Sequence, residues 1–257
     1  MTKICICFFG VISRSLPHTI DSINTNIFNV LKESGISYDV YVHNMKVNKF
    51  ESTTSKNDKV DNLKDCCKLL KCDYFSETNQ NDFDEKNLSL FRRSWKYGFN
   101  FGFTKLTFKN AIRQLHSIKQ VTKLWESKNK QYDFYIYLRP DLKYTTKINI
   151  DQILQYINNN HVLLSPYWGR WYNGLNDRIY MGTKKVIKLF GNRIDEVVEI
   201  IEKRKKPYHP ELFMRYTAQK YNIQIVDIDF MASRVKTSGF VVNEEEDEIK
   251  LRKQLKK

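Results

Sequence analysis

Three apolar runs that have the length of buried strands end in residues that could bind a ligand. These residues are Gly10 with Arg14, His43, and the triplet Arg139-Pro140-Asp141, at the ends of the runs 3–9, 38–43 and 132–138. A guanidinium grips a diphosphate with two parallel hydrogen bonds, and a carboxylate suits a hard cation or a ribose hydroxyl. Because open parallel α/β sheets bind ligands at the carboxyl ends of their strands, these positions predict a site for a phosphorylated ligand.

The turn at residues 139–141 carries the strongest of these signals. Pro140 has no N–H to donate to a strand ladder, so the strand stops there and Asp141 is held on a fixed turn. The other two places have structural alternatives, a tight turn for Gly10 and Arg14 and a solvated loop for His43. Neither GxGxxG nor GxxxxGK[ST] occurs, which excludes a dinucleotide fingerprint and a P-loop.

The apolar periodicity predicts an α/β fold with a Rossmann-type, mostly parallel sheet flanked by helices. Residues 3–9, 18–34 and 38–43 predict a strand, a helix and a strand, which make a βαβ unit. Further strands are expected at 72–75, 132–138, 161–164, 179–181 and 223–230, and further helices at 103–128, 148–157, 183–190, 194–205 and 210–221. Residues 48–64 are polar and predict an exposed loop. We expect a single domain over residues 1–242, followed by a charged tail at 243–257.

The composition limits the class of protein and its compartment. The chain has 257 residues, with 43 Lys and Arg against 29 Asp and Glu, so it carries a formal charge of +14. Such a field attracts nucleic acid, anionic membrane or phosphorylated small molecules, although a general bias toward Lys, Asn and Ile explains it equally well. Five cysteines without a CxxC argue against a disulfide framework and a zinc site, and no apolar run approaches membrane-spanning length. We therefore expect a cytoplasmic protein without a transmembrane segment.

Several segments in the same order resemble a family of GT-A type glycosyltransferases from giant DNA viruses and bacterial polysaccharide clusters. They are KICICFFGVISRSLPHTIDSI, YDVYVHN, NAIRQLHSIKQV, YDFYIYLRPDL and NDRIYMGTKKV. The resemblance implies a GT-A-like fold with a nucleotide-sugar-binding half at about 1–145 and an acceptor half at 146–242. It also implies a nucleoside-diphosphate sugar donor, a glycan acceptor and, for a viral protein, the host cytoplasm.

In such enzymes an Asp-x-Asp after a central strand holds a divalent metal that bridges the donor diphosphate. Here Arg139 stands where the first Asp is usual, so the resemblance leaves Asp141 as the residue for Mn²⁺ or Mg²⁺, with Arg139 as an alternative partner of the leaving diphosphate. A literal Asp-x-Asp at Asp227-Ile228-Asp229 comes late in the chain, inside a predicted strand, and we interpret it as structural.

The resemblance also suggests a carboxylate base. Glu211 lies in the first turn of a helix opened by Pro210, and this helix is similar to the Glu-bearing acceptor helix of inverting GT-A enzymes. A glutamate favoured there by the helix dipole is the structural alternative, and Asp177 is the competing candidate.

Other residues are candidates for contacts with the donor or the acceptor. The aromatic loop 167–172 contains Trp168, Arg170 and Trp171, a potential stacking surface for sugars, with core packing as the alternative. Arg113, with Gln114 beside it, is placed to reach the donor from a helix, and Arg234 is placed to meet phosphate. For Arg113 and Gln114, a solvated helix face is the alternative.

Two other functions remain open. A basic nucleic-acid-binding protein needs its cations on one surface with aromatic residues between them, whereas the Lys and Arg here are spread along the chain. A nucleotidyltransferase of similar fold needs a Gly-rich loop after the first strand, where VISRSLP stands instead.

Overall fold

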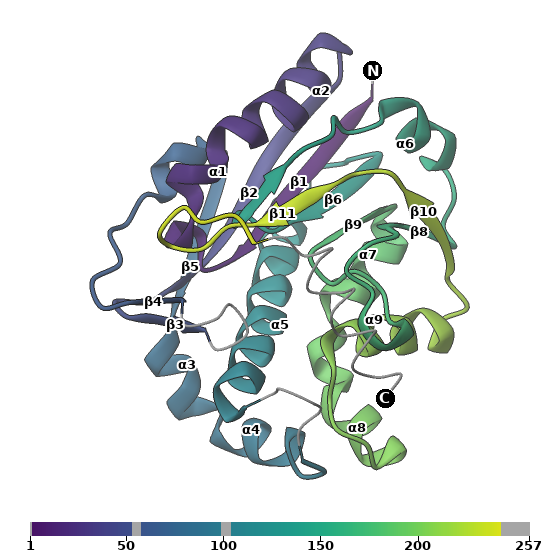
Figure 1. Cartoon of the computed structure of the whole chain (residues 1–257). Helices are drawn as coiled ribbons and strands as arrows, with labels where there is room; N and C mark the ends of the chain where they lie inside the picture. Colours follow the sequence, from purple (N-terminus) through teal and green to yellow (C-terminus); the bar gives the residue numbers. More distant parts are fainter. Residues whose placement is uncertain (1, 53–57, 99–103, 243–257) are drawn as a thin grey trace, which may run out of the picture.

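The computed structural model describes residues 2–52, 58–98 and 104–242, and within them one seven-stranded sheet carries helices on both faces (Figure 1). The order across the sheet is β10-β8-β9-β6-β1-β2-β5. These strands are β1 (Lys3–Gly10), β2 (Ser37–Lys46), β5 (Tyr74–Asn79), β6 (Phe134–Leu138), β8 (Val162–Pro166), β9 (Ile179–Gly182) and β10 (Gln224–Ile228). The predicted tail, 243–257, lies outside the described residues.

The pairing confirms the predicted Rossmann-type, mostly parallel sheet. Strand β1 pairs in parallel with β2 and with β6, β2 pairs in parallel with β5, and β10 pairs in parallel with β8. Strand β9 runs antiparallel between β6 and β8. The four strands β5-β2-β1-β6 repeat the third-second-first-fourth order of a nucleotide-binding half. The division into two halves near residue 145 stays a prediction, since this one sheet continues across it.

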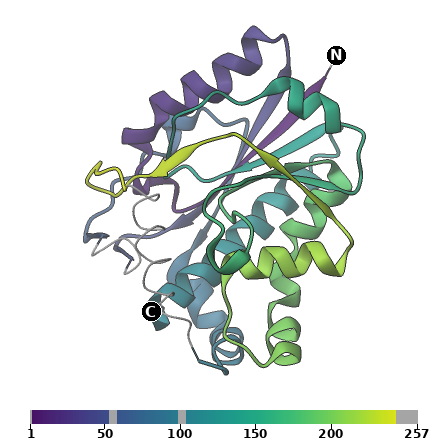
Figure 2. The same ribbon diagram turned by 45° about the vertical axis from the view of Figure 1, so that its right-hand side comes forward.

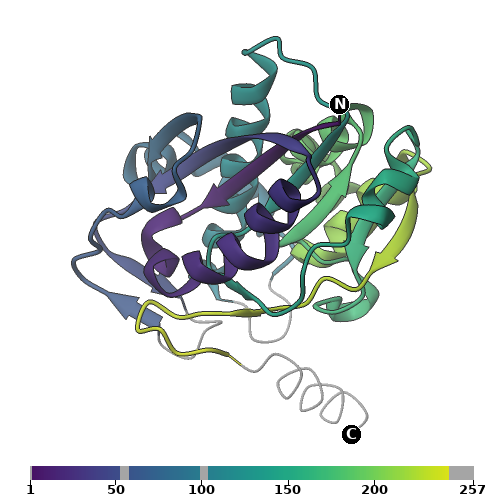
Figure 3. The ribbon, with the colours of Figure 1, turned by 90° about the horizontal axis from the view of Figure 1, so that it is seen from above.

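The alternation of side chains along β1 explains why both faces of the sheet are covered. Ile4, Ile6 and Phe8 join a buried cluster with α1 (Leu16–Ile23) and α2 (Asn29–Glu33). Cys5 and Cys7 point the opposite way, into a cluster with α5 (Lys105–Glu126). Helices α1 and α2 therefore lie on one side of the sheet and α5 on the other, as the view from above shows (Figure 3).

Most predicted helices are found close to their expected bounds. The remaining helices are α3 (Gln80–Lys86), α4 (Leu88–Ser94), α6 (Ile150–Tyr156), α7 (Lys184–Gly191), α8 (Val197–Arg204) and α9 (Pro210–Lys220). The helix predicted for residues 18–34 begins earlier and contains a π-helical turn, η2 (Asn24–Phe28), and it ends before Gly35, whose φ is +66°. Among the described residues, no helix is both long and apolar enough to cross a bilayer.

The prediction of an exposed loop at residues 48–64 is wrong. This segment contains the antiparallel hairpin of β3 (Phe50–Ser52) and β4 (Asp58–Val60), and it buries Phe50 and Asp58. The polar composition hid the hairpin because the buried partner of Phe50 is an arginine: the Arg14 guanidinium lies 4.6 Å from the Phe50 ring centroid.

The last described segment returns across the sheet to the first loop (Figure 2). After β10 the chain forms β11 (Ala232–Arg234), which pairs antiparallel with β7 (Leu142–Tyr144). The Ser15 hydroxyl donates to the Val235 carbonyl at 2.6 Å. Neither short strand was predicted, since three residues are too few to show a period.

Candidate functional site

The candidate site lies where strands β1 and β6 end side by side at the carboxyl edge of the sheet. After β1 the next strands, β2 and β5, are added on one side of it, whereas β6 is added on the other side and borders β9. The direction in which strands are added therefore reverses between β1 and β6, and open α/β sheets bind their ligands at such a point. The turn η1 (Ile12–Arg14) follows β1, and the turn 139–141 follows β6.

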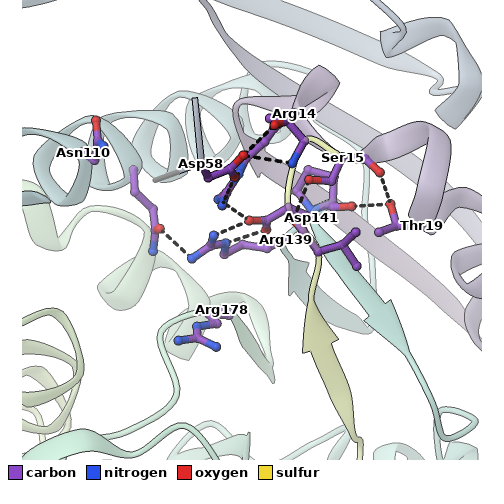
Figure 4. A network of polar contacts seen from close by, with 12 residues as sticks. Arg14, Ser15, Thr19, Asp58, Asn110, Arg139, Asp141 and Arg178 are labelled. Atoms are coloured by element: carbon purple, nitrogen blue, oxygen red, sulfur yellow. Dashed lines mark hydrogen bonds and ion pairs between the residues drawn. The ribbon is translucent and has the colours of Figure 1, made fainter. Parts of the chain in front are cut away.

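Four charged side chains form a buried network between these two turns (Figure 4). Arg14 donates from Nε and Nη2 to Oδ2 of Asp58, at 3.1 and 2.8 Å, and from Nη1 to Oδ2 of Asp141 at 2.6 Å. Arg139 holds Asp141 in a bidentate pair, at 2.8 Å from Nε to Oδ1 and 2.5 Å from Nη2 to Oδ2. Burial opposes ionisation of Asp141, but the positive charges of Arg139 and Arg14 outweigh it and hold the pKa of this carboxyl well below its usual range.

Hydrogen bonds from four elements fix the backbone of the turn at 139–141. The Arg139 N–H donates to the Arg178 carbonyl, and the Arg139 carbonyl accepts from the Tyr144 hydroxyl at 2.9 Å. The Pro140 carbonyl accepts from the Thr19 hydroxyl at 2.6 Å. The Asp141 carbonyl accepts from the backbone N–H of Val235 at 2.8 Å. The two charged side chains of the turn are thus presented by a preorganised backbone.

Gln114 extends the network from the arginines to a second carboxylate. Its Oε1 accepts from Nη1 of Arg139 at 3.3 Å, and its Nε2 donates to Oδ2 of Asp177 at 2.8 Å. Asp177 and Arg178 come just before β9, and because β9 is antiparallel, its beginning lies at the same edge as the end of β6. The reversed strand therefore carries Asp177 to the arginines.

Glu211, the predicted base, lies beside Asp177 at the start of α9. Its side chain is buried, and Nδ1 of His209 lies 3.0 Å from its Oε2. Burial raises the pKa of Glu211, and the negative charge of Asp177 raises it further. The Tyr172 ring packs edge-on against His209 at 4.6 Å between centroids. Two carboxylates in one environment favour one protonated and one ionised group, which is a common arrangement in acid–base chemistry.

Ser117 of α5 connects the end of β2 to the end of β1 by hydrogen bonds. The Ser117 hydroxyl donates to the His43 carbonyl at 3.1 Å, accepts from the Gly10 N–H at 2.8 Å and lies 2.7 Å from Nδ1 of His43. On the other side of the ring, Nε2 of His43 lies 3.0 Å from the Thr78 hydroxyl. Burial, and then the charge of His116, lowers the pKa of His43 to about 3, so the ring is neutral. His43, predicted to contact the donor, is engaged within the protein and positions the end of β1.

Gly10 ends β1, and its contact with the donor stays a prediction. Its φ of +107° is a conformation that residues with a side chain rarely adopt, and a Cβ added there meets no atom within 4 Å. The backbone at the end of β1 is therefore open to close approach.

A divalent cation at Asp141 was predicted, and the donor set does not fit it. Both carboxylate oxygens accept hydrogen bonds from guanidinium groups, and the residue is 3% exposed. A hard cation needs such oxygens for itself at about 2.0–2.2 Å and is repelled by the adjoining guanidinium charges. Within residues 2–52, 58–98 and 104–242, no cluster of three or more His, Cys, Asp or Glu side chains has the arrangement of a metal site.

Of the two other arginines predicted to contact the donor, Arg234 lies near the network and Arg113 is bonded elsewhere. Arg234, on β11, lies close enough for its charge to lower the pKa of Asp141. Arg113 instead pairs with Asp84 of α3 and donates to Asn110 at 2.6 Å, so its guanidinium is held by neighbours outside the network. Arg113 was predicted from a helix pattern that does not fix which of two adjacent side chains faces the sheet edge.

The aromatic loop differs from the predicted stacking surface. Trp168 is 8% exposed, belongs to the core cluster and donates from its indole to the Phe230 carbonyl at 2.9 Å. Arg170 donates to the Pro166 and Ser165 carbonyls and to Asp227, which ties the loop to β8 and β10. Trp171 is partly exposed, in η4 (Trp171–Asn173), and its contact with a substrate stays a prediction.

Three residues of the site were missed by the sequence reasoning. Asp58 gave no signal, because it stands in a polar stretch where a buried carboxylate cannot be told from a solvated one. Arg178 is adjacent to Asp177 in the segment NDRIYMG, and His209 precedes Pro210 and Glu211. For these two the signal was present, since each neighbours a residue already selected.

Comparisons with known proteins give remote likenesses only. No protein-family model and no curated protein matches the chain. Among solved structures, it is similar to mouse xyloside xylosyltransferase 1 in its apo form, at 12% identity and a TM-score of 0.45, over 89% of this chain and 86% of that chain. It is also similar to a glycosyltransferase involved in the glycosylation of the major capsid of PBCV-1, at 11% identity and a TM-score of 0.40, over 88% of this chain and 83% of that chain. At these identities and TM-scores, the likeness assigns no activity to this chain.

Proposed function

We propose that this protein is a glycosyltransferase that moves a sugar from a nucleoside-diphosphate sugar to a hydroxyl group of a glycan. The observation that carries the proposal is the continuous polar network at the switch point of the sheet. It joins the guanidinium of Arg139, through Gln114, to Asp177, which lies beside Glu211. Cations for a leaving diphosphate and a carboxylate for an acceptor hydroxyl thus belong to one site.

The reaction breaks the bond between the anomeric carbon and the diphosphate oxygen and forms a new bond from that carbon to the acceptor oxygen. Negative charge grows on the diphosphate as it leaves, and fixed guanidinium groups stabilise it. Arg139 is held by Asp141 and Gln114 and does not have to reorganise during the step. The backbone of Gly10 leaves room for the donor to approach the end of β1.

Glu211 is the proposed base that takes the proton of the acceptor hydroxyl. A base acts in its ionised form, and its raised pKa makes the carboxylate a stronger proton acceptor than a solvated glutamate. Activity is therefore expected to rise with pH through the pKa of Glu211, above its ordinary value of 4.5. Asp177 is the competing base, and its Oδ2 accepts a hydrogen bond from Gln114.

A screen with purified protein tests the activity. Thermal stabilisation and turnover are measured with UDP-, GDP- and dTDP-sugars, because a bound donor stabilises the folded state. Glu211→Gln is expected to cut transfer about 100-fold or more with little change in donor affinity, as loss of a general base does. Equal loss of donor binding and transfer would assign Glu211 to structure, and the same measurement on Asp177→Asn tests the competing base.

Binding to nucleic acid is the outcome that would replace this proposal. That outcome is retention on DNA that falls steeply with salt, together with no stabilisation by any sugar nucleotide and no hydrolysis of one. It would indicate that the charge of +14 serves to bind nucleic acid.

A further inference from the structure

The predicted metal ligand, Asp141, lies among positive charges. Four guanidinium groups act on the carboxylates of the site, those of Arg14, Arg139, Arg178 and Arg234. The carboxylates are those of Asp58, Asp141 and Asp177, with Glu211 beside Asp177. A divalent cation at Asp141 would be repelled by the guanidinium groups around it, whereas a diphosphate would be attracted by them.

Arg139 is the member of the network with the best access to a ligand. Its side chain is 16% exposed, compared with 7% for Arg14 and 4% for Asp141. The hydrogen bonds to Asp141 and Gln114 occupy three of the five N–H groups of a guanidinium. Arg139 therefore keeps donors for a further acceptor while the Asp141 carboxylate fixes its plane. Figure 4 shows the side chain of Arg178 on the side of Arg139 that faces away from Arg14.

We propose that Arg139 binds the donor diphosphate directly, with the charge of Arg178 adding to the attraction and no divalent cation between protein and phosphate, and that Asp141 is a positioning residue for Arg139. This inference rests on the proposed function and defines how its donor is held. Guanidinium groups bind phosphate oxygens with charge-assisted, often bidentate hydrogen bonds, which supply the neutralisation that a metal otherwise provides. Asp141 contacts arginines in this arrangement and makes no contact with the donor.

The first test compares binding with and without metal. The affinities of UDP, GDP and dTDP for the whole protein are measured by calorimetry in EDTA and again in Mn²⁺. The nucleotide that binds is expected to show the same dissociation constant in both, within about twofold. Paramagnetic resonance of Mn²⁺ is expected to show no ion immobilised on the protein–nucleotide complex. Binding or turnover that EDTA abolishes and Mn²⁺ restores would overturn the inference and leave the proposed function standing.

The second test replaces the arginines. Arg139→Gln is expected to raise the dissociation constant at least about tenfold, since it removes charge-assisted hydrogen bonds. Arg178→Gln is expected to raise it by a smaller factor, since it removes a nearby positive charge. Arg93→Gln is the matched control, because Arg93 is exposed and pairs with Glu202 far along the chain. Arg139→Lys, which keeps the charge but loses the bidentate fork, is expected to bind more tightly than Arg139→Gln. Unchanged affinity in both glutamine variants would overturn the inference.

A failure of the proposed function is distinguishable from both results. If no nucleoside diphosphate or sugar nucleotide binds in either EDTA or Mn²⁺, the glycosyltransferase proposal falls and takes this inference with it. If the chosen nucleotide binds only with metal, the inference alone is wrong.

Discussion

At the scale of single residues, the two carboxylates Asp141 and Glu211 have opposite electrostatic environments. Asp141 is surrounded by guanidinium groups that favour its charge, whereas Glu211 is buried beside another carboxylate that opposes its charge. Removing the negative charge is therefore expected to lower the free energy of unfolding at Asp141 and to raise it at Glu211. Both residues were predicted from the sequence, but the sign of their environments was not, because it depends also on residues distant in the chain, Arg14 for Asp141 and Asp177 for Glu211.

Asp141→Asn is expected to lower the free energy of unfolding by about 3–5 kcal/mol at pH 7, because it removes the charged partner of Arg139 and one of the two carboxylate partners of Arg14. The folded-state pKa of Asp141 is lowered, so its contribution is complete above the unfolded pKa of about 3.9 and is lost as pH falls toward the folded value. The difference between wild type and variant should therefore shrink below about pH 4. Urea unfolding across this range measures it. Asp195→Asn, at an exposed ion pair with Lys119, should cost about 1 kcal/mol or less.

Glu211→Gln is expected to gain stability relative to wild type as pH rises. The folded-state pKa of Glu211 is raised, so wild type loses stability as pH climbs from the ordinary value of 4.5 through the folded one. Glutamine resembles the protonated acid and does not titrate. The two proteins should be nearly equal at pH 4 and should diverge by pH 8. Glu85→Gln, at an exposed position, should track wild type across the whole range. If Glu211→Gln also tracks wild type, the raised pKa is wrong.

At the scale of elements, helix α5 organises the carboxyl edge of the sheet. Within four positions it presents Gln114 to the turn after β6 and Ser117 to the ends of β1 and β2. The sequence predicts the helix and most strands because each buries a face with a clear period. It does not predict the hairpin β3–β4 or the pair β7–β11, whose strands have three residues each and are held by the site itself.

Ser117→Ala is expected to lower the free energy of unfolding by about 1–3 kcal/mol, because it leaves the Gly10 N–H and the His43 carbonyl without their buried partner. Donor affinity should fall as well, since the end of β1 loses its support. Denaturant unfolding and nucleotide titration measure the two effects. Ser127→Ala is the control, because that hydroxyl lies on an exposed turn. A loss no greater than in the control would show that Ser117 has no structural role.

At the scale of the whole molecule, one carboxylate ties together segments that are far apart in the sequence. Oδ2 of Asp58 accepts from Arg14, and Oδ1 accepts from the backbone N–H and the hydroxyl of Thr237, at 3.1 and 2.5 Å. The parallel sheet was predictable because its strands alternate with helices. The hydrogen bonds that join Arg14, Asp58 and Thr237 were not predictable, because the residues around them in the sequence show no apolar period.

A double-mutant cycle tests whether the hairpin and the last described segment act as one unit. Thr237→Val should cost about 1 kcal/mol or more, since it removes a hydroxyl donor from a buried carboxylate. When Thr237→Val is combined with Asp58→Ala, the total loss should fall short of the sum of the single losses by at least about 0.5 kcal/mol, because both changes remove the hydrogen bond between the two side chains. Thr237→Val with Ser117→Ala should be additive within about 0.5 kcal/mol, because the two share no partner. An additive result in the first cycle would contradict the coupling.

The pairing of Arg14 with carboxylates that come much later in the chain has a consequence for synthesis on the ribosome. The carboxylate partners of Arg14 lie 44 and 127 positions later, and Thr237 lies 179 positions beyond Asp58. A nascent chain that has emerged only as far as β6 already contains the first βαβ unit and Asp58, yet Arg14 still lacks Asp141 and Asp58 still lacks Thr237. The protein is therefore expected to complete the proposed donor site late in translation, after residue 237 has left the exit tunnel.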